Sequence, residues 1–217
     1  DLPGKQPELV KAIYATGTPV ILVMQSGRPV SCTWEQKHIP AIVQCWFPGE
    51  KGGYAMADTL FGDNNPSGRL PMTYPRHVGQ VPCHYTRRPG GGRRYIDMSW
   101  TPLYPFGYGL SYTTFAPENV TCTSEGDRLQ ISLDLHNTGE CDGAEVIQIY
   151  LSGRNGDVVM PVRELKAYQR AEVAAGASVR VALEIPAEAF CYYDHRMAYG
   201  MHDCDYTVSV ATSCVDV

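Results

Sequence analysis

The stretch "LQISLDL", residues 129–135, alternates apolar and polar side chains with a period of two residues. In an extended strand, this period places one set of apolar side chains on a single face: Leu129, Ile131, Leu133 and Leu135. A strand that buries one face and exposes the other is typical of antiparallel sheets. The pattern therefore predicts β structure with a one-sided core in this part of the chain.

Further segments of the same kind follow this strand. They are "EVIQIYL" from Glu145, "SVRVALEI" from Ser178 and "YTVSV" from Tyr206. The turn-forming sequences "NTG", "SGRNGD" and "AAGAS" separate them. Short strands between turn signals over roughly 100 residues indicate an antiparallel β-sandwich. We predict that it occupies residues 116–217.

The first part of the chain has a different pattern. "PELVKAIYATG", residues 7–17, places its apolar side chains on one helical face and ends on Gly17. "TPVILVMQSG" and "IPAIVQCWF" each predict a strand buried on both faces, and "EKGGYAMADTLFG" predicts a helix closed by Gly62. This order indicates part of an α/β unit, which we place at residues 1–75. The segment is short for a complete one.

Residues 76–115 are rich in Pro, Gly and aromatic side chains and predict a long connection. The sequence "PGGG" lies between two arginine pairs, Arg87 with Arg88 and Arg93 with Arg94. These guanidinium groups suit either an acidic ligand or a solvated surface. The aromatic run "WTPLYPFGYGLSYTTF", residues 100–115, suits either stacking on a sugar or packing within the protein.

Composition excludes several classes of protein. The net charge of −5 hides an asymmetry, with eleven Lys/Arg against seven Asp/Glu in residues 1–115 and seven against sixteen in residues 116–217. Neither part has the dense basic face of a nucleic-acid binder. No apolar run is long enough to span a membrane. The start at Asp1 shows no signal peptide and suggests a processed product or a fragment.

Eight cysteines are scattered without a C-x-x-C pair. We favour mostly free, buried thiols over a disulfide framework, with Cys191 and Cys204 as the first pair to test. Free thiols favour a cytoplasmic location, although a secreted or periplasmic one stays open.

No cofactor or metal site is predicted. The P-loop pattern and the G-x-S-x-G elbow are absent, and "PGEKGG" is a better match to a tight turn than to an anion site. One further set of residues has the elements of a zinc site without the usual ligand spacing: Cys191, His195, His202 and Cys204.

Several blocks resemble the second half of family 3 glycoside hydrolases. They are "LPGKQPELVKAI", "GTPVILVMQSGRPV", "IPAIVQCWFPGEKGGYAMADTLFGDNNPSGRLPMTYPR" and "PLYPFGYGLSYTTF". "NTGECDGAEVIQIYL" and "PVRELKAYQR" resemble the fibronectin type III-like domain that follows in many of these enzymes. The resemblance implies a partial α/β sandwich followed by an antiparallel fibronectin type III-like β-sandwich, in an enzyme that also has a TIM-like barrel.

The resemblance also implies a retaining β-glycosidase, which needs two carboxyl groups about 5 Å apart. In the family, the nucleophile Asp lies on the barrel and the acid/base Glu lies shortly before the "LPGKQ" block, so we expect both outside this chain. We assign no catalytic residue here. Three carboxylates near the family blocks are interpreted as structural: Glu50, Asp58 and Asp63.

Candidate substrate-binding residues lie in the long connection: Arg93, Arg94, Tyr95 and Trp100. The expected substrate is a β-linked oligosaccharide or an aryl glycoside, and the expected partner is an N-terminal barrel-bearing chain or fragment. A β-glucosidase is favoured over a β-xylosidase only by its frequency in the family. The alternative is a noncatalytic module that binds carbohydrate or scaffolds an assembly.

Overall fold

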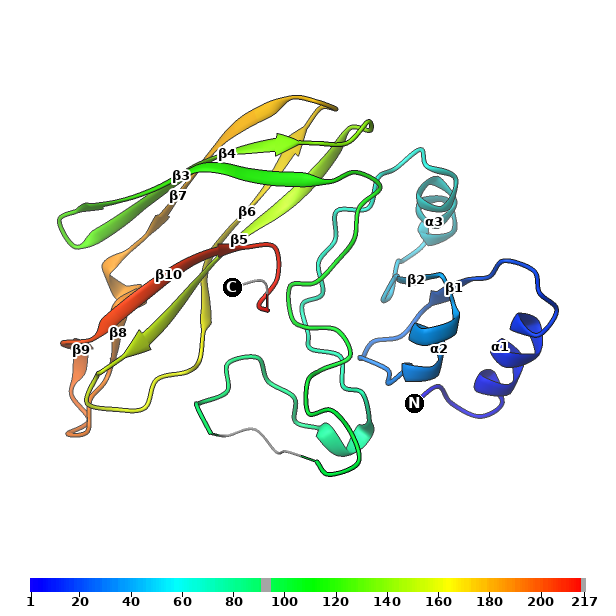
Figure 1. Cartoon of the computed structure of the whole chain (residues 1–217), viewed down its shortest axis with the longest axis horizontal. Helices are drawn as coiled ribbons and strands as arrows, with labels where there is room; N and C mark the ends of the chain where they lie inside the picture. Colours follow the sequence, from blue (N-terminus) through cyan, green and yellow to red (C-terminus); the bar gives the residue numbers. More distant parts are fainter. Residues whose placement is uncertain (91–94, 216–217) are drawn as a thin grey trace. The chain divides into compact units, whose positions relative to one another are not determined.

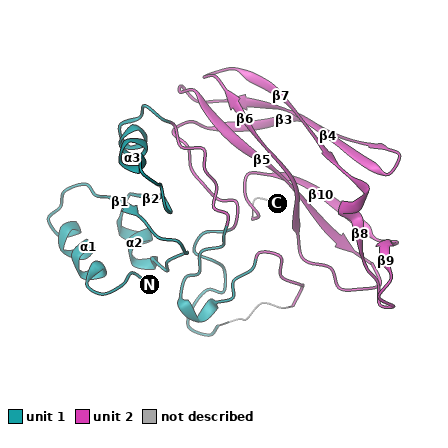
Figure 2. Ribbon diagram, turned by 180° about the vertical axis from the view of Figure 1, so that it is seen from behind, with its two compact units in different colours: residues 1–64, 72–84, 93–105 teal, residues 65–71, 85–92, 106–217 magenta. Residues whose placement is uncertain are grey.

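The computed structural model describes residues 1–90 and 95–215 (Figure 1). Contacts divide the chain into two compact units that alternate along the sequence (Figure 2). Unit 1 comprises Asp1–Asn64, Met72–His84 and Arg93–Pro105. Unit 2 comprises Asn65–Pro71, Tyr85–Gly92 and Phe106–Val217. Residues of the predicted connection thus belong to both units.

Unit 1 contains a small parallel sheet and short helices. Strands β1 (Ile21–Met24) and β2 (Ala41–Gln44) pair in parallel. The helices are α1 (Gln6–Tyr14), α2 (Thr33–His38), α3 (Gly52–Phe61) and the 3₁₀ helix η1 (Val78–Gln80). Two predicted helices and two predicted strands are confirmed, and α2 was not predicted. Helix α3 ends as expected, because Gly62 adopts a left-handed φ of 90° at its C-cap.

The predicted burial of unit 1 is wrong within the described residues. Met24 is the one buried residue of β1, and β2 has none. The apolar side chains of α3 are also open, with Tyr54 76% and Phe61 87% exposed. The physical reason is that a two-stranded sheet and short helices supply too little surface to cover these side chains. The apolar side chains of these strands and of α3 therefore suit a core that is larger than the one within unit 1.

Unit 2 is an antiparallel β-sandwich, as predicted. One sheet has the order β3–β4–β7 and the other β10–β5–β6. Their bounds are β3 Phe115–Glu125, β4 Arg128–Asn137, β5 Gly143–Arg154, β6 Glu164–Val173, β7 Ser178–Ile185 and β10 Asp205–Ala211. A 3₁₀ helix, η2 (Ala187–Phe190), leads into a small hairpin of β8 (Cys191–Tyr193) and β9 (Tyr199–Met201).

The alternating side chains form the sandwich core. Ile131, Leu133 and Leu135 of β4 are buried, and they cluster with apolar side chains of β5, β6 and β7. Strand β5 is buried on both of its faces over most of its length. Its second face is covered because segments 65–71 and 106–112 of unit 2 pair through Leu70 and make hydrogen bonds to β5 side chains.

The cysteine prediction holds in one respect and fails in another. None of the eight cysteines forms a disulfide, and Cys191 is not bonded to Cys204. Most of them are not buried, because only Cys32 and Cys214 lie in a core. The others lie on strands, loops or the hairpin, where neighbouring elements cover them incompletely.

Candidate functional site

The predicted substrate-binding residues lie in one stretch of unit 1, only part of which is described. Arg93 and Arg94 fall outside the described residues. Tyr95 is partly buried, and its hydroxyl donates a hydrogen bond to the Gly79 carbonyl at 3.1 Å. Trp100 is 38% exposed. The phenol of Tyr95 is thus held in place, while part of the Trp100 indole is open to a ligand.

Gln80 joins two backbone segments that are close in sequence to these aromatic side chains or their partners. It is buried, and its Oε1 accepts a hydrogen bond from the Arg76 peptide N–H at 2.6 Å. Its Nε2 donates to the Ser99 carbonyl at 3.3 Å. Arg76 Nε donates to the Thr101 carbonyl at 2.9 Å. The Gln80 amide and the Arg76 guanidinium together tie the stretch from Ser99 to Thr101 to the segment before it.

Two buried titratable side chains of unit 1 are unsuited to catalysis. Burial raises the pKa of the Cys32 thiol to about 11, and it also raises the pKa of the Tyr74 hydroxyl. The thiolate is the reactive form of cysteine, so a protonated, buried thiol is inert. Tyr74 is enclosed, and its backbone pairs with that of Leu103 and Tyr104. We interpret both side chains as part of the core.

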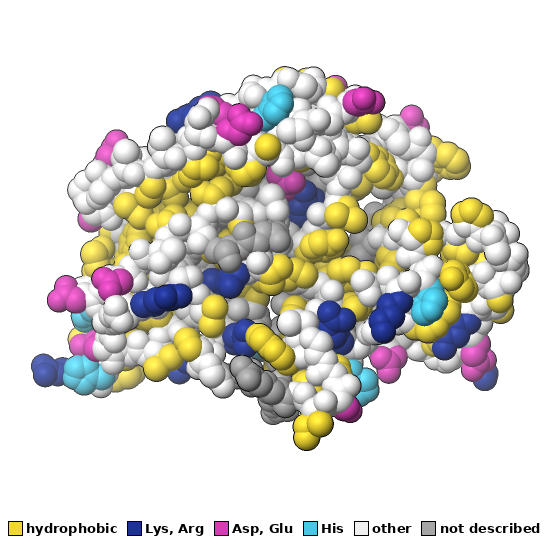
Figure 3. All heavy atoms as spheres, viewed as in Figure 1, with side chains coloured by type: hydrophobic (Ala, Val, Ile, Leu, Met, Phe, Trp, Pro, Cys, Tyr) yellow, Lys and Arg dark blue, Asp and Glu magenta, His cyan; other side chains and the backbone are white. Residues whose placement is uncertain are grey.

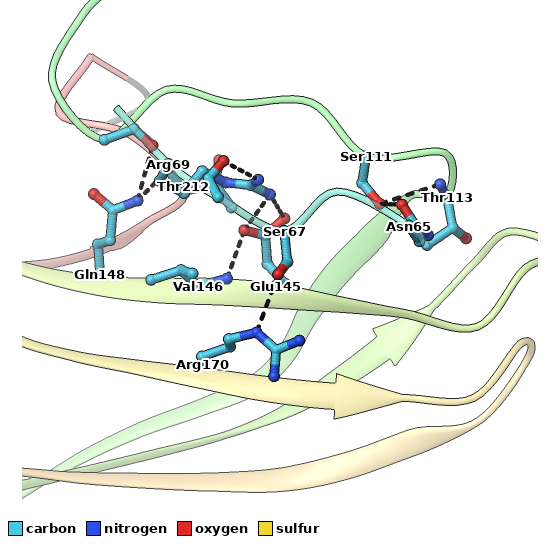
Figure 4. A network of polar contacts seen from close by, with 12 residues as sticks. Asn65, Ser67, Arg69, Ser111, Thr113, Glu145, Val146, Gln148, Arg170 and Thr212 are labelled. Atoms are coloured by element: carbon cyan, nitrogen blue, oxygen red, sulfur yellow. Dashed lines mark hydrogen bonds and ion pairs between the residues drawn. The ribbon is translucent and has the colours of Figure 1, made fainter. Parts of the chain in front are cut away.

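The strongest polar cluster lies in unit 2, where the motif "NNPSGRLP" meets the sandwich (Figure 4). Asn65 is the second residue of the motif. Its Oδ1 accepts hydrogen bonds from the Ser111 hydroxyl at 2.8 Å and from the Tyr112 peptide N–H at 2.9 Å. Its Nδ2 donates to the Asp142 carbonyl at 2.9 Å. One amide side chain therefore joins three segments of unit 2.

Arg69 and Glu145 form a buried ion pair in the same cluster. Arg69 Nη2 lies 2.6 Å from both carboxylate oxygens of Glu145, and each side chain is only 7% exposed. Glu145 Oε1 also accepts a hydrogen bond from the Val146 peptide N–H at 2.8 Å. Both carboxylate oxygens therefore accept hydrogen bonds from the protein, and the group is enclosed in the fold. It is unavailable as an acid or base.

Gln148 is the second buried anchor of this cluster. Its Nε2 donates to the carbonyls of Gly107 and Thr212, and its Oε1 accepts from the Tyr150 hydroxyl at 2.6 Å. The signal for this role was a single polar residue within the apolar run "EVIQIYL". Sequence reasoning missed it, and it also missed Arg69, because Gly107 lies 41 residues from Gln148 and Glu145 lies 76 residues from Arg69 along the chain.

The carboxylates interpreted as structural are exposed. Glu50, Asp58 and Asp63 all lie at the surface of unit 1. Within the described residues, one group of side chains is close enough to share a metal ion: Asp157, Asp194 and His195. Its oxygens already accept hydrogen bonds, since Asp194 Oδ1 binds the peptide N–H groups of Arg196 and Ala198. The set from Cys191 to Cys204 considered for zinc is not brought together in the described chain.

The lowered pKa of Asp157 predicts that the fold loses stability in acid. The side chain of His195, then its peptide N–H, and the Tyr192 hydroxyl donate hydrogen bonds that lower the Asp157 pKa to about 2 from an ordinary value of 3.8. A carboxyl group whose pKa is lowered in the folded state stabilises the fold at pH values above its ordinary pKa of 3.8. This stabilisation is lost as the pH falls from 3.8 towards 2.

We therefore expect Asp157→Asn to reduce the drop in melting temperature between pH 5 and pH 2.5. Thermal melts of both proteins at the two pH values measure the effect, and the common acid sensitivity cancels in the comparison. An identical drop in the two proteins would contradict this assignment.

With the fold and its anchors described, comparison with known proteins identifies the family. The sequence model of the glycosyl hydrolase family 3 C-terminal domain matches residues 1–112. The chain belongs to glycosyl hydrolase family 3. A fibronectin type III-like domain model matches residues 145–214. The family and the fold class predicted from the sequence are both confirmed.

Relatives of this family 3 chain are named as glycosidases. A "Periplasmic beta-glucosidase" of Salmonella typhimurium is 38% identical, over 100% of this chain and 30% of the relative. A "Beta-xylosidase" of Formosa agariphila is 37% identical, over 98% and 31%. The crystal structure of a β-glucosidase from Listeria innocua in complex with glucose matches with a TM-score of 0.92 and 33% identity, over 99% and 32%. The chain thus spans about a third of the length of these relatives.

Proposed function

We propose that this chain is the C-terminal portion of a retaining β-glycosidase of the β-glucosidase type. The observation that carries the proposal is a match over nearly the whole chain to proteins named β-glucosidases and β-xylosidases, of which it covers about 30%. One similar structure, a mutant β-glucosidase from Listeria innocua, is a complex with laminaribiose. The proposed substrates are therefore terminal β-linked sugars.

Both catalytic carboxylates are proposed to come from a barrel-bearing segment or partner chain. A retaining mechanism needs a nucleophile and an acid/base about 5 Å apart across the glycosidic bond. Two of the acidic side chains described above already have partners within the protein. Glu145 forms a buried ion pair, and Asp157 accepts three hydrogen bonds. The proposed contribution of this chain is to position the substrate and complete the fold.

The open apolar surface of unit 1 supports this proposal. Leu9, Ile21, Phe47, Tyr54 and Phe61 are all exposed. Apolar side chains are visible over much of the molecular face in Figure 3. A monomeric protein rarely leaves large apolar patches in water. The occupant we propose is the remainder of the α/β unit, which would extend the two-stranded sheet and cover these side chains.

The substrate-binding residues remain part of this proposal. Tyr95 and Trp100 are offered as groups that contact the sugar at the outer end of the site, together with Arg93 and Arg94. The proposed boundaries are likewise 1–75 for the partial α/β unit, 76–115 for the connection and 116–217 for the β-sandwich. A structure of the complete enzyme with bound sugar tests the four side chains. The assignment is wrong if none of them touches the ligand.

Activity provides the direct test of the proposed function. The 217-residue chain alone should not hydrolyse an aryl β-glucoside. Coexpression with the N-terminal segment should raise the rate by at least about 10⁴-fold, because both catalytic carboxyl groups are restored. Replacing the acid/base Glu of that segment with Gln is the matched control and should abolish the gain. Turnover by the purified chain, with no larger fragment present, would contradict the proposal.

A cytoplasmic location is a separate proposal, with a secreted or periplasmic location as the alternative. No helix of the described chain is long and apolar enough to cross a membrane. The lack of a disulfide among the eight cysteines supports the cytoplasm, whereas one relative is named a periplasmic enzyme. Fractionation of cells followed by immunodetection distinguishes the two.

A further inference from the structure

A pocket of about 310 Å³ lies at one end of the β-sandwich in unit 2. It is formed where the loop after β5 meets β6, η2, β8 and β10. Leu151 and Phe190 are buried parts of its lining, and the loop contributes Val158–Pro161. Its volume is at the lower end of the range of small-molecule sites. We propose that this pocket binds a β-linked disaccharide or the end of a longer oligosaccharide.

The aromatic side chains of the pocket are held in fixed positions. The Tyr192 hydroxyl donates to Asp157 Oδ1 at 3.1 Å, and the Tyr206 hydroxyl donates to the Phe190 carbonyl at 2.9 Å. The Phe190 and Tyr206 rings also pack edge to face, with centroids 5.1 Å apart. Because these rings are ordered before a ligand arrives, binding costs little additional side-chain entropy.

Tyr193 provides the open aromatic surface. It is 58% exposed although it lines the pocket. Tyr199 faces it across the hairpin, with the ring centroids 5.0 Å apart. The two rings are tilted by 49°, so Tyr199 supports Tyr193 from the side while the Tyr193 ring lines the pocket. The apolar face of a sugar ring can pack on such a surface while the hydroxyls at its edge reach polar groups.

The charged side chains that line the pocket carry both signs: Arg88, Glu164 and Lys166. Lys166 Nζ and Glu164 Oε2 lie 3.3 Å apart, and both side chains remain partly exposed. This pair offers hydrogen-bond donors and acceptors side by side. A ligand with vicinal hydroxyls can use both, whereas a cation is repelled by Lys166 and Arg88. The choice of a β-linked sugar among such ligands rests on the proposed glycosidase function.

Methionine-methyl NMR on the complete enzyme tests the pocket directly. The probe is laminaribiose with sulfur in place of the glycosidic oxygen, which resists hydrolysis. Met160 lines the pocket, so its methyl resonance, assigned with Met160→Leu, should shift saturably as the probe is added. Absence of a shift in the unmodified enzyme would overturn the proposal.

Variants of Tyr193 test the aromatic contact. Tyr193→Ala should weaken binding about tenfold or more, because it removes a large apolar contact. Tyr193→Phe should retain binding, which separates loss of the ring from loss of the fold. Tyr168→Ala removes another exposed tyrosine of the same sandwich, outside the pocket, and should change nothing. Equal effects of Tyr193→Ala and Tyr168→Ala would overturn the proposal.

Variants of the charged pair test the ligand class. Lys166→Met and Glu164→Gln should each weaken binding of the neutral probe. If Glu164→Gln instead strengthens binding of this probe, the carboxylate does not accept a hydrogen bond from the sugar and its assigned role is wrong. Hydrolysis of an aryl β-glucoside is measured in parallel. Hydrolysis without a Met160 shift refutes the pocket alone, and a Met160 shift without hydrolysis refutes the proposed function alone.

Discussion

Replacing Arg69 with alanine should lower the free energy of unfolding of unit 2 by about 3–5 kcal/mol. The guanidinium lies 2.6 Å from both oxygens of Glu145, and both side chains are almost fully buried (Figure 4). The alanine variant leaves the Glu145 carboxylate buried without its counter-charge. That uncompensated charge, rather than the lost attraction, accounts for most of the expected cost.

A double variant separates these two contributions. Arg69→Met combined with Glu145→Leu removes both charges and should cost much less than Arg69→Ala alone. Ser67→Ala is the local control, because it removes only the exposed hydrogen bond from Arg170 Nε at 3.1 Å. Hydrogen exchange of the β5 amides reports the stability of unit 2 separately from the rest of the protein. Equal destabilisation by the single and double variants would contradict the buried-charge explanation.

Gly107→Ala is the second substitution with a large expected effect, about 3 kcal/mol of destabilisation. Gly107 adopts a left-handed φ of 80°, which disfavours any residue with a Cβ. A Cβ there would also overlap Oε1 of Gln148, which is buried and bonded to Tyr150. Since Gln148 Nε2 binds the Gly107 carbonyl, displacement of this amide leaves several buried polar groups without partners.

Gly126 provides a matched control for the backbone contribution. It has a comparable φ of 66°, and a Cβ there would meet no atom within 4 Å. Gly126→Ala should therefore show only the left-handed backbone cost, about 1 kcal/mol. Hydrogen exchange of β5 in the Gly107 variant and of β4 in the Gly126 variant measures the two effects. The role assigned to Gln148 is wrong if the two substitutions cost the same.

The apolar patterns of the sequence predicted strands well and burial unevenly. The alternation around Ile131 and Leu133 predicted the core face of β4 correctly, because the partner sheet is present in the same unit. The apolar runs of β1 and β2 predicted strands correctly but burial wrongly, because unit 1 lacks the elements that would cover them. Strand β3 was missed, since its side chains are exposed on both faces and show no apolar alternation beyond Ala116.

The candidate sites also differ in how far the sequence alone could predict them. Tyr95 and Trp100 came from a resemblance and remain predictions, and Arg93 and Arg94 lie outside the described residues. The lining of the pocket beside Tyr193 comes from β5, β6, η2, β8 and β10, which no local pattern links. Its polar pair, Glu164 and Lys166, lies two residues apart on β6 and forms an ion pair at 3.3 Å.

The sequence was sufficient to establish the family, the antiparallel sandwich and the cap of α3 at Gly62. The sandwich and the cap depend on the period of the apolar side chains and on the φ preference of single residues, both of which are local, whereas the family follows from the resemblance of whole sequence blocks. Only the tertiary structure revealed that Arg69 binds Glu145 and that Gln148 binds Gly107. Such contacts join residues far apart along the chain, so they depend on the path of the folded backbone and leave no repeating pattern in the sequence.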